Sequence, residues 1–335
     1  MPAPIALSVC ITTRNREPYI AETLESILSQ CPPGVEIVVV DGASSDGTVD
    51  VVRSLGRRFP QLRLITQSKN SGLDADFDKA VLVAHGRHCW LFSDDDLLVP
   101  GALARVLDAC SEDPTVVIVD ASVHNPDFSQ AFERHRLPAT ARARYTELQS
   151  AAFFRDCAAH LTFIGAVIVR RDFWLSRERA RYYGSEFIHC GVLFQAPIPG
   201  VVRLLREPLV QIRYGVGNWN SRAFEVWMYN WPRLVWSFDW IDAATRRSVF
   251  ELEPWKNPRW LIGYRATGQY GWRQFLDLVM PRAVHKSQLF IPLALAITPG
   301  WFAYAAVRLR MRWLHPNGSI HQVLDGSPYR WGPAT

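Results

Sequence analysis

One segment of the chain reads Trp90-Leu91-Phe92-Ser93-Asp94-Asp95-Asp96-Leu97-Leu98, an apolar run followed directly by three carboxylates. The apolar run is typical of a buried strand, whereas aspartate is disfavoured inside strands and adjacent like charges repel one another. We therefore expect the strand to end here, with the carboxylates at the mouth of a sheet. Magnesium prefers carboxylate oxygens and is typically held by one or two of them together with substrate phosphates. The segment predicts a metal–diphosphate site; the alternative is a solvated acidic turn before a helix that starts near Pro100.

Other apolar runs in the first part of the chain predict the remaining strands of the same sheet. We expect these strands at residues 7–12, 35–40, 62–66 and 116–120. The spacing of apolar residues between them predicts helices at residues 17–30, 49–59, 73–85 and 100–110. Strands that alternate with amphipathic helices of about 10–15 residues indicate βαβ units. The sequence thus predicts an α/β fold, a Rossmann-like, mostly parallel sheet flanked by helices.

Polar loops follow three of these strands, at residues 12–16, 41–48 and 94–96. Because crossovers between parallel strands are right-handed, the carboxyl ends of these strands lie along one edge of the sheet. Ligands of open α/β sheets bind in the crevice at that edge. The chain contains no GxGxxG or Walker A sequence, which disfavours a dinucleotide site or a P-loop.

Composition limits the domain count and the partners. A chain of 335 residues that is 48% hydrophobic allows one large or two moderate domains with ample core. The formal charge is +5, and the whole basic excess lies after Glu251. A basic, aromatic tail favours an anionic surface, either a membrane or a nucleic acid. The six cysteines are scattered without metal-ligand spacing and the N-terminus lacks a signal-peptide pattern, so we expect reduced thiols and a cytoplasmic location.

Three motifs in this order resemble those of family 2 glycosyltransferases with the GT-A fold. They span residues 7–16, 36–48 and 92–96. Within that family, residues 70–76 followed by 90–96 are most similar to bacterial deoxysugar transferases such as abequosyltransferases of O-antigen synthesis. The resemblance is strong over residues 1–120 and weaker over the next 90 or so. It predicts a catalytic domain at 1–215, with a nucleotide-sugar half at 1–120 and an acceptor half at 121–215, followed by a helical region at 216–335.

The resemblance implies roles for residues of the donor half. Thr12 and Arg14 would line the nucleoside pocket, and Asp41 would hydrogen-bond the base or the ribose. The three aspartates would form the DxD-type element, with Asp94 or Asp95 facing the ribose and Asp94 and Asp96 holding Mg²⁺ or Mn²⁺. A basic–Asn pair common in the family is replaced by Phe77-Asp78. We expect Asp74 or Lys79 to substitute for the missing phosphate or ribose contact.

The general base should come from the acceptor half, where an acidic pair follows a glycine in the family. Only Glu186 of that pair remains, because Ser185 stands in the other position. We predict Glu186 as the base, with His189 as the rival, since histidine is a natural base near neutral pH. A helix there would place both on one face; the alternative is a surface glutamate and a packed histidine. Arg213 follows a strand-like run and would touch the diphosphate or form a structural ion pair.

The last third of the chain has a different character. Trp227 and Trp231, and Trp236 and Trp240, show the i,i+4 spacing of a helix, which most often reflects core packing. Residues 287–307 carry no charge, but Pro292, Pro299 and Gly300 interrupt them and arginines follow. Two short helices lying in the membrane interface fit this pattern better than a single span; the alternative is a soluble helical hairpin. We expect peripheral association with the inner face of the cell membrane and no nucleic-acid partner; the oligomeric state stays open.

Together these features predict an inverting, metal-dependent glycosyltransferase of bacterial surface polysaccharide synthesis. A sugar would move from a nucleotide-sugar donor to a glycan acceptor linked to polyprenyl diphosphate. A first alternative is a sugar-1-phosphate nucleotidyltransferase, which would need a glycine-rich basic loop after the first strand; residues 12–16 contain no glycine. A second is a non-catalytic, membrane-associated module that retains only the nucleotide pocket.

Overall fold

The computed structural model describes residues 4–217, 222–314 and 320–330. The chain divides into two compact units. The first comprises Met1–Tyr214 and Ser237–Val249, and the second comprises Gly215–Trp236 and Phe250–Thr335. The predicted helical region at 216–335 therefore includes a segment, Ser237–Val249, that belongs to the first unit: its helix α10 (Ala243–Val249) contacts α5 (Ser150–Cys157).

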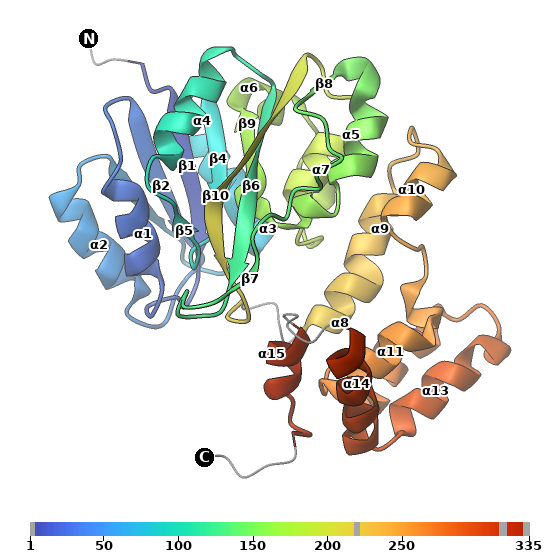
Figure 1. Cartoon of the computed structure of the whole chain (residues 1–335). Helices are drawn as coiled ribbons and strands as arrows, with labels where there is room; N and C mark the ends of the chain where they lie inside the picture. Colours follow the sequence, from blue (N-terminus) through green and yellow to red (C-terminus); the bar gives the residue numbers. More distant parts are fainter. Residues whose placement is uncertain (1–3, 218–221, 315–319, 331–335) are drawn as a thin grey trace. The chain divides into compact units, whose positions relative to one another are not determined.

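Four parallel strands form one half of the sheet in the first unit (Figure 1). Their order is β3 (Leu62–Thr66), β2 (Val35–Asp41), β1 (Leu7–Thr13) and β4 (His88–Phe92). The helices that connect or follow them are α1 (Ile20–Leu28), α2 (Thr48–Arg58), α3 (Leu73–Val83) and α4 (Ala102–Ser111). β1 and β2 are buried along their whole length, which explains their continuous apolar runs. The predicted α/β sheet flanked by helices is confirmed.

The other half of the sheet is mixed. β9 (Val167–Arg170) lies antiparallel between β4 and β6 (Val116–His124), and β10 (Val201–Arg213) runs parallel to β6. β5 (Leu97–Leu98) and β8 (Arg144–Thr146) pair with β10, and β7 (Ala131–Glu133) pairs with β6. A 3₁₀ turn, Ile164–Ala166, directly precedes β9. That turn lets the carbonyl of Gly165 accept the indole N–H of Trp90 at 2.8 Å.

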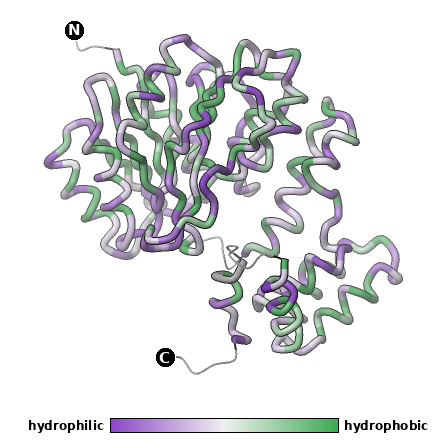
Figure 2. Tube along the Cα trace, viewed as in Figure 1, coloured by the Kyte–Doolittle hydropathy of each residue, from purple (hydrophilic) through white to green (hydrophobic). Residues whose placement is uncertain are grey.

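The core of the first unit lies on both faces of this sheet. Val9, Ile37 and Trp90 are completely buried, and the strands are hydrophobic along most of their length (Figure 2). At roughly 25 cal/mol per Å² of buried apolar surface, this core stabilises the unit far more than any single polar contact. The sheet therefore holds its carboxyl edge as a rigid platform for polar loops.

The second unit is helical. Its longer helices are α11 (Pro258–Ala266), α13 (Phe290–Ile297) and α14 (Gly300–Leu314). The shorter ones are α8 (Ala223–Glu225), α9 (Trp231–Trp236), α12 (Trp272–Gln274) and α15 (Ile320–Asp325). Phe224 stacks on Tyr270 with ring centroids 4.9 Å apart in a small aromatic core. In the described part of the chain no single helix is long and apolar enough to cross a membrane. The pair Lys286–Ile297 and Gly300–Leu314 meets that criterion only together, bent by 93°.

Candidate active site

The loops that follow β1 and β2 are joined by a set of short hydrogen bonds. The backbone N–H of Asn15 donates to Oγ of Ser44 at 2.9 Å, and Oδ1 of Asn15 accepts the N–H of Ser45 at 2.8 Å. The backbone N–H of Arg16 donates to Oγ1 of Thr48 at 2.7 Å. Since β1 and β2 are parallel neighbours, their carboxyl ends lie side by side, and these bonds make the two loops one surface.

Arg16 connects this surface to the three aspartates. Its Nε lies 3.2 Å from Oδ1 of Asp94 and its Nη2 lies 3.0 Å from Oδ2 of Asp95. All three side chains are buried. The predicted meeting of three polar loops at one sheet edge is thus what the structure shows, and a buried arginine, not a solvated turn, holds the carboxylates. Arg14, which was expected in the nucleoside pocket, lies exposed on the same loop as Arg16.

The aspartate cluster is poor in solvent and rich in negative charge. Burial, then repulsion from Asp95, raises the pKa of Asp94 to about 7 despite the opposing effect of Arg16. Burial, again with the Asp95 charge, raises the pKa of Asp96 well above its usual range. Such a site favours a bound cation or proton, because either relieves the repulsion between desolvated carboxylates. The donor set suits Mg²⁺ or Mn²⁺ completed by diphosphate oxygens. In the described residues, no three acidic, histidine or cysteine side chains form a metal cluster by themselves.

Arg213 is a structural partner of this cluster. Its backbone N–H donates to Oδ1 of Asp96 at 2.8 Å, and its Nε donates to the carbonyl of Asp95 at 2.9 Å. The guanidinium also contacts the carboxylate of Glu22 and stacks on Phe128. Through these contacts Arg213 braces the backbone that carries the aspartates, and with Glu22 it forms the structural ion pair considered above.

Asp41 ends β2 and shapes the second loop. Its carboxylate accepts the backbone N–H of Ser44 at 3.1 Å and the hydroxyl of the same residue. Gly42 lies very close to Asp76 of α3: a Cβ added at Gly42 would lie only 2.7 Å from Oδ2 of Asp76. Asp76 in turn accepts hydrogen bonds from Gln67 and Ser71. The first turn of α3 is therefore fitted against the Asp41 loop, and Thr12 is buried at the end of β1 beside it.

Glu186 lies in a turn, not in a helix. Its φ is +67°, and α7 (Ile188–Phe194) begins only two residues later. The predicted shared helical face with His189 is therefore wrong. His189 is 1% exposed, and its Nε2 hydrogen-bonds the carbonyl of Leu161 at 2.7 Å. Burial lowers its pKa to about 4. A ring enclosed in this way cannot reach a substrate, so the packed-core alternative holds for His189.

Asp74 also differs from its expected role. Both carboxylate oxygens accept backbone N–H groups, from Glu186 at 2.8 Å and from Ile188 at 3.0 Å. The residue is 3% exposed. Its carboxylate thus serves the turn that carries Glu186 instead of a phosphate or ribose. Asp78, one helical turn later, is similarly occupied by Trp174, Arg179 and Tyr183.

Comparison with known proteins shows which protein family the chain belongs to. The family model "Glycosyl transferase family 2" matches residues 8–175, half of the chain, and the chain belongs to this family. Among curated proteins it is similar to an abequosyltransferase, RfbV, of Salmonella typhimurium, with 28% identity over 62% of this chain and 66% of that protein. It is also similar to a chondroitin synthase of Escherichia coli, with 29% identity over 36% of this chain. The chain spans 66% of the length of the first relative and 18% of the second.

Solved structures share the architecture. TarS of S. aureus, residues 1–349, superposes with a TM-score of 0.54 and 17% identity over 77% of this chain and 79% of that one. The same protein in complex with UDP-GlcNAc superposes with a TM-score of 0.53 over 91% of this chain and 92% of that one. At this identity the likeness concerns the fold alone, and it supports the predicted GT-A-like architecture with a helical C-terminal region.

Sequence reasoning missed Arg16 at this site and gave Asp74 a different role. Arg16 was part of the first polar loop, but nothing in the sequence distinguished it from Arg14, because both are arginines two residues apart in a loop. Asp74 was expected to replace a phosphate or ribose contact, and only the long-range contact with the turn at 184–188 identifies its partner.

Proposed function

We propose that this protein is an inverting, metal-dependent glycosyltransferase that transfers a sugar from a nucleotide-sugar donor to a glycan acceptor in bacterial surface polysaccharide synthesis. The observation that carries the proposal is the buried aspartate cluster tied by Arg16 to both donor-side loops. A cluster with raised pKa values gains stability from a cation, and the diphosphate of a donor supplies the remaining ligands. The names of the relatives, which include a putative teichuronic acid biosynthesis glycosyltransferase, support the polysaccharide context.

The donor's nucleotide would bind along the surface made by the loops after β1 and β2. Asp41 ends β2 and Thr12 is the next-to-last residue of β1. Arg16, in the loop after β1, binds Asp94 and Asp95. Asp41, whose carboxylate is buried and already oriented by Ser44, would accept a hydrogen bond from the base or ribose. Asp94 and Asp96 would hold Mg²⁺ or Mn²⁺, which when bound offsets the charge that develops on the leaving diphosphate.

Glu186 would act as the general base of the transfer. The bond between the anomeric carbon and the diphosphate oxygen breaks, and a new bond to the acceptor oxygen forms on the opposite face of the sugar. Glu186 takes the proton of the acceptor hydroxyl. The first turn of α3 supports this assignment because Asp76 packs at Gly42 of the donor loop while Asp74 holds the backbone of Glu186. The base is therefore linked to the donor loop through two residues of a single helical turn.

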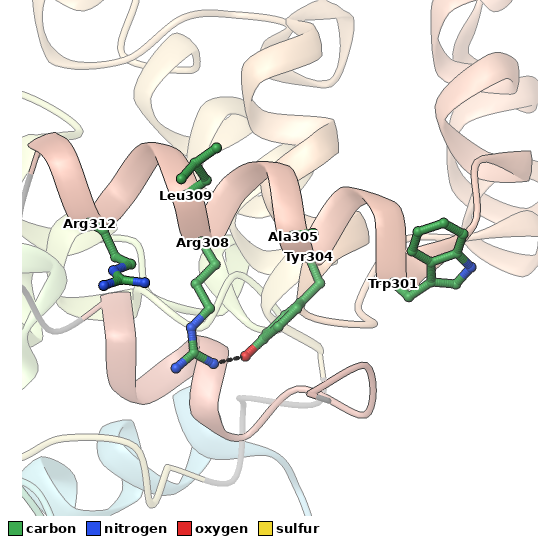
Figure 3. A pocket seen from close by; sticks show the side chains of 6 residues that line it. All are labelled: Trp301, Tyr304, Ala305, Arg308, Leu309 and Arg312. Carbon is green, nitrogen blue, oxygen red and sulfur yellow. Dashed lines mark hydrogen bonds between the residues drawn. The ribbon is translucent and has the colours of Figure 1, made fainter. Parts of the chain in front are cut away.

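The acceptor is proposed to be a glycan on a polyprenyl diphosphate at the cytoplasmic face of the membrane. The second unit supports this through α13 and α14, where Phe290, Trp301 and Trp313 are 75%, 52% and 83% exposed. Large exposed aromatics beside arginines are typical of helices that lie in a membrane interface. Figure 3 shows a pocket along α14 that is lined by Trp301, Tyr304, Ala305, Arg308, Leu309 and Arg312. Arg308 and Arg312 extend from the same side of the helix, as anchoring to anionic head groups requires.

Donor hydrolysis tests the enzyme assignment. We expect the wild-type protein to release nucleoside diphosphate from at least one of a panel of UDP-, GDP-, CDP- and TDP-sugars in the presence of Mn²⁺, and to lose this activity in EDTA. Asp96→Asn should lower the Mn²⁺-dependent rate by at least about 100-fold, because a metal ligand is removed. Asp113→Asn is the matched control, since Asp113 is a half-buried carboxylate that pairs with Arg87. Equal activity of wild type and Asp96→Asn would remove the metal role. Nucleotide binding without turnover of any sugar would favour the non-catalytic module.

A further inference from the structure

We infer that Asp74 is a positioning residue for the general base: its buried carboxylate holds the turn at residues 184–188 and so sets the orientation of Glu186. This inference rests on the proposed function, in which Glu186 takes the acceptor proton. Asp74 itself touches neither donor nor acceptor in this assignment. Its role is to fix a backbone segment that lies 112 residues away in the sequence.

The contacts between Asp74 and the turn are directional. Oδ2 accepts the N–H of Glu186 at 2.8 Å and Oδ1 accepts the N–H of Ile188 at 3.0 Å. Burial raises the pKa of Asp74, while hydrogen bonds from the backbone of residues 184, 185, 186 and 188 oppose that rise. A carboxylate surrounded by successive N–H groups occupies a backbone nest of the kind that binds anions. Here the anion is supplied by another part of the same chain.

The turn needs such support for two reasons. Glu186 has φ of +67°, in the left-handed region that costs a non-glycine residue free energy unless its surroundings enforce it. α7 also begins directly after the turn, and Phe187 at its N-cap provides no side-chain cap. Asp74 satisfies the N–H of Ile188 and places negative charge at the positive end of this helix. One carboxylate thus stabilises both the strained base residue and the helix that follows.

Asp78 fixes the other side of the same segment. It lies on the same face of α3 as Asp74, one helical turn away. Its carboxylate accepts the indole N–H of Trp174 at 2.9 Å and the hydroxyl of Tyr183 at 2.6 Å, and pairs with Arg179. The partners of Asp78 are side chains of residues that precede the turn at 184–188 in the sequence. Asp74 instead binds backbone N–H groups of the turn itself. Asp74, and not Asp78, is therefore the carboxylate that orients the backbone of Glu186.

Hydrogen exchange gives a direct test of the holding role. In Asp74→Asn we expect the amides of Glu186 and Ile188 to exchange at least 10-fold faster than in wild type, measured by mass spectrometry on peptides covering 182–194. Asp120→Asn is the matched control: Asp120 is a buried carboxylate that accepts the N–H groups of Arg136 at 2.9 Å and Leu137 at 2.7 Å. It should accelerate exchange at its own loop and leave 182–194 unchanged. Unaltered exchange at 182–194 in Asp74→Asn would overturn the inference.

Kinetics test whether the held turn matters for transfer. We expect Asp74→Asn to lower kcat by about 10–100-fold, as misplacement of a catalytic group does, with the affinity for UDP and Mn²⁺ unchanged. Gly184→Ala is a second variant if Asp74→Asn folds poorly. Gly184 has φ of +85° with no atom within 4 Å of an added Cβ, so alanine strains the turn without a clash and should also lower kcat selectively.

The controls separate this inference from the proposed function. If Glu186→Gln is inactive while Asp74→Asn and Gly184→Ala keep wild-type kcat, Glu186 remains the base and the positioning role of Asp74 is wrong. If Glu186→Gln keeps wild-type turnover, the base assignment of the proposed function fails. A parallel loss of UDP affinity in Asp74→Asn would show that the residue serves the donor, as the sequence first suggested, and would also overturn the inference.

Discussion

Nε of Arg16 lies 3.2 Å from Oδ1 of Asp94, in an ion pair that is buried on both sides although 78 residues separate its members. The pair connects the first and the fourth strand-end loops of the parallel half of the sheet. It also explains how three adjacent aspartates remain together in a place with little water. The guanidinium supplies a permanent positive charge, and its planar fork reaches two carboxylates at once.

Arg16→Ala should therefore destabilise the protein by roughly 3 kcal/mol, because removing one partner leaves desolvated carboxylates uncompensated. Because the pKa of Asp94 is about 7, part of the Asp94 population is protonated at neutral pH. This reduces the uncompensated charge, so the loss of stability lies at the low end of the range for broken buried ion pairs. Urea unfolding at neutral pH measures it, and Mn²⁺ with UDP should restore more stability to the variant than to wild type. Arg87→Ala breaks a surface ion pair with Asp113 that water screens, so it should destabilise the protein far less than Arg16→Ala does. Similar losses in the two variants would contradict a special role for Arg16.

Gly42→Ala should destabilise the protein by about 1–3 kcal/mol, since the new Cβ would lie 2.7 Å from Oδ2 of Asp76 and the packed first turn of α3 must shift. The same substitution should weaken UDP binding, because the Asp41 loop moves with it. Gly56→Ala is the control: its nearest neighbour is 3.7 Å away in the middle of α2, so alanine should stabilise by about 0.5–1 kcal/mol. Thermal unfolding with and without UDP distinguishes the two variants; a neutral Gly42→Ala would argue against the close fit.

The stability contributed by His189 should depend on pH in a defined direction. Its pKa in the folded protein is lowered to about 4 by burial, below the ordinary value of 6.5. As the pH falls, His189 therefore takes up a proton in the unfolded chain before it does so in the folded protein. The stability that the neutral, buried His189 contributes is present above pH 6.5 and is lost as the pH falls towards 4. His189→Gln retains a donor for the carbonyl of Leu161 but cannot titrate. From pH 7 to pH 5, its stability relative to wild type should improve by about 2 kcal/mol. Denaturant unfolding at both pH values measures this difference, and a pH-independent difference would contradict it.

Membrane association of the second unit should depend on the arginines of α14. We expect the full chain to float with phosphatidylcholine vesicles only when they contain phosphatidylglycerol. Each basic residue near such a surface contributes about 1 kcal/mol, so Arg308→Gln with Arg312→Gln should lower partitioning roughly 30-fold. The control is a double variant in which the same replacements are made at Arg53 and Arg57, two exposed arginines of α2 in the first unit. It changes the net charge of the protein equally but leaves α14 intact. Equal flotation of both double variants would rule out α14 as the anchor.

Local patterns in the sequence predicted much of the fold. Buried apolar runs correspond to β1, β2, β3 and β4, and amphipathic spacing corresponds to α1–α4, because these elements bury continuous surfaces whose periodicity is visible residue by residue. The mixed half of the sheet was less predictable. The strand β9 is only four residues long and antiparallel, and its partners lie on either side of it from distant parts of the chain.

At the candidate site, the sequence by itself determined which chemical groups meet: carboxylates, hydroxyls and an arginine follow parallel strands whose ends share one edge. Only the tertiary structure decided which of these groups bind one another. Arg16 pairs with Asp94 and Asp95, Asp74 is directed to the turn of Glu186, and His189 is enclosed in the core. The physical reason is that the positions of strands and helices along the chain follow from local periodicity, whereas the partner of a buried charge depends on desolvation and on contacts between residues about a hundred positions apart.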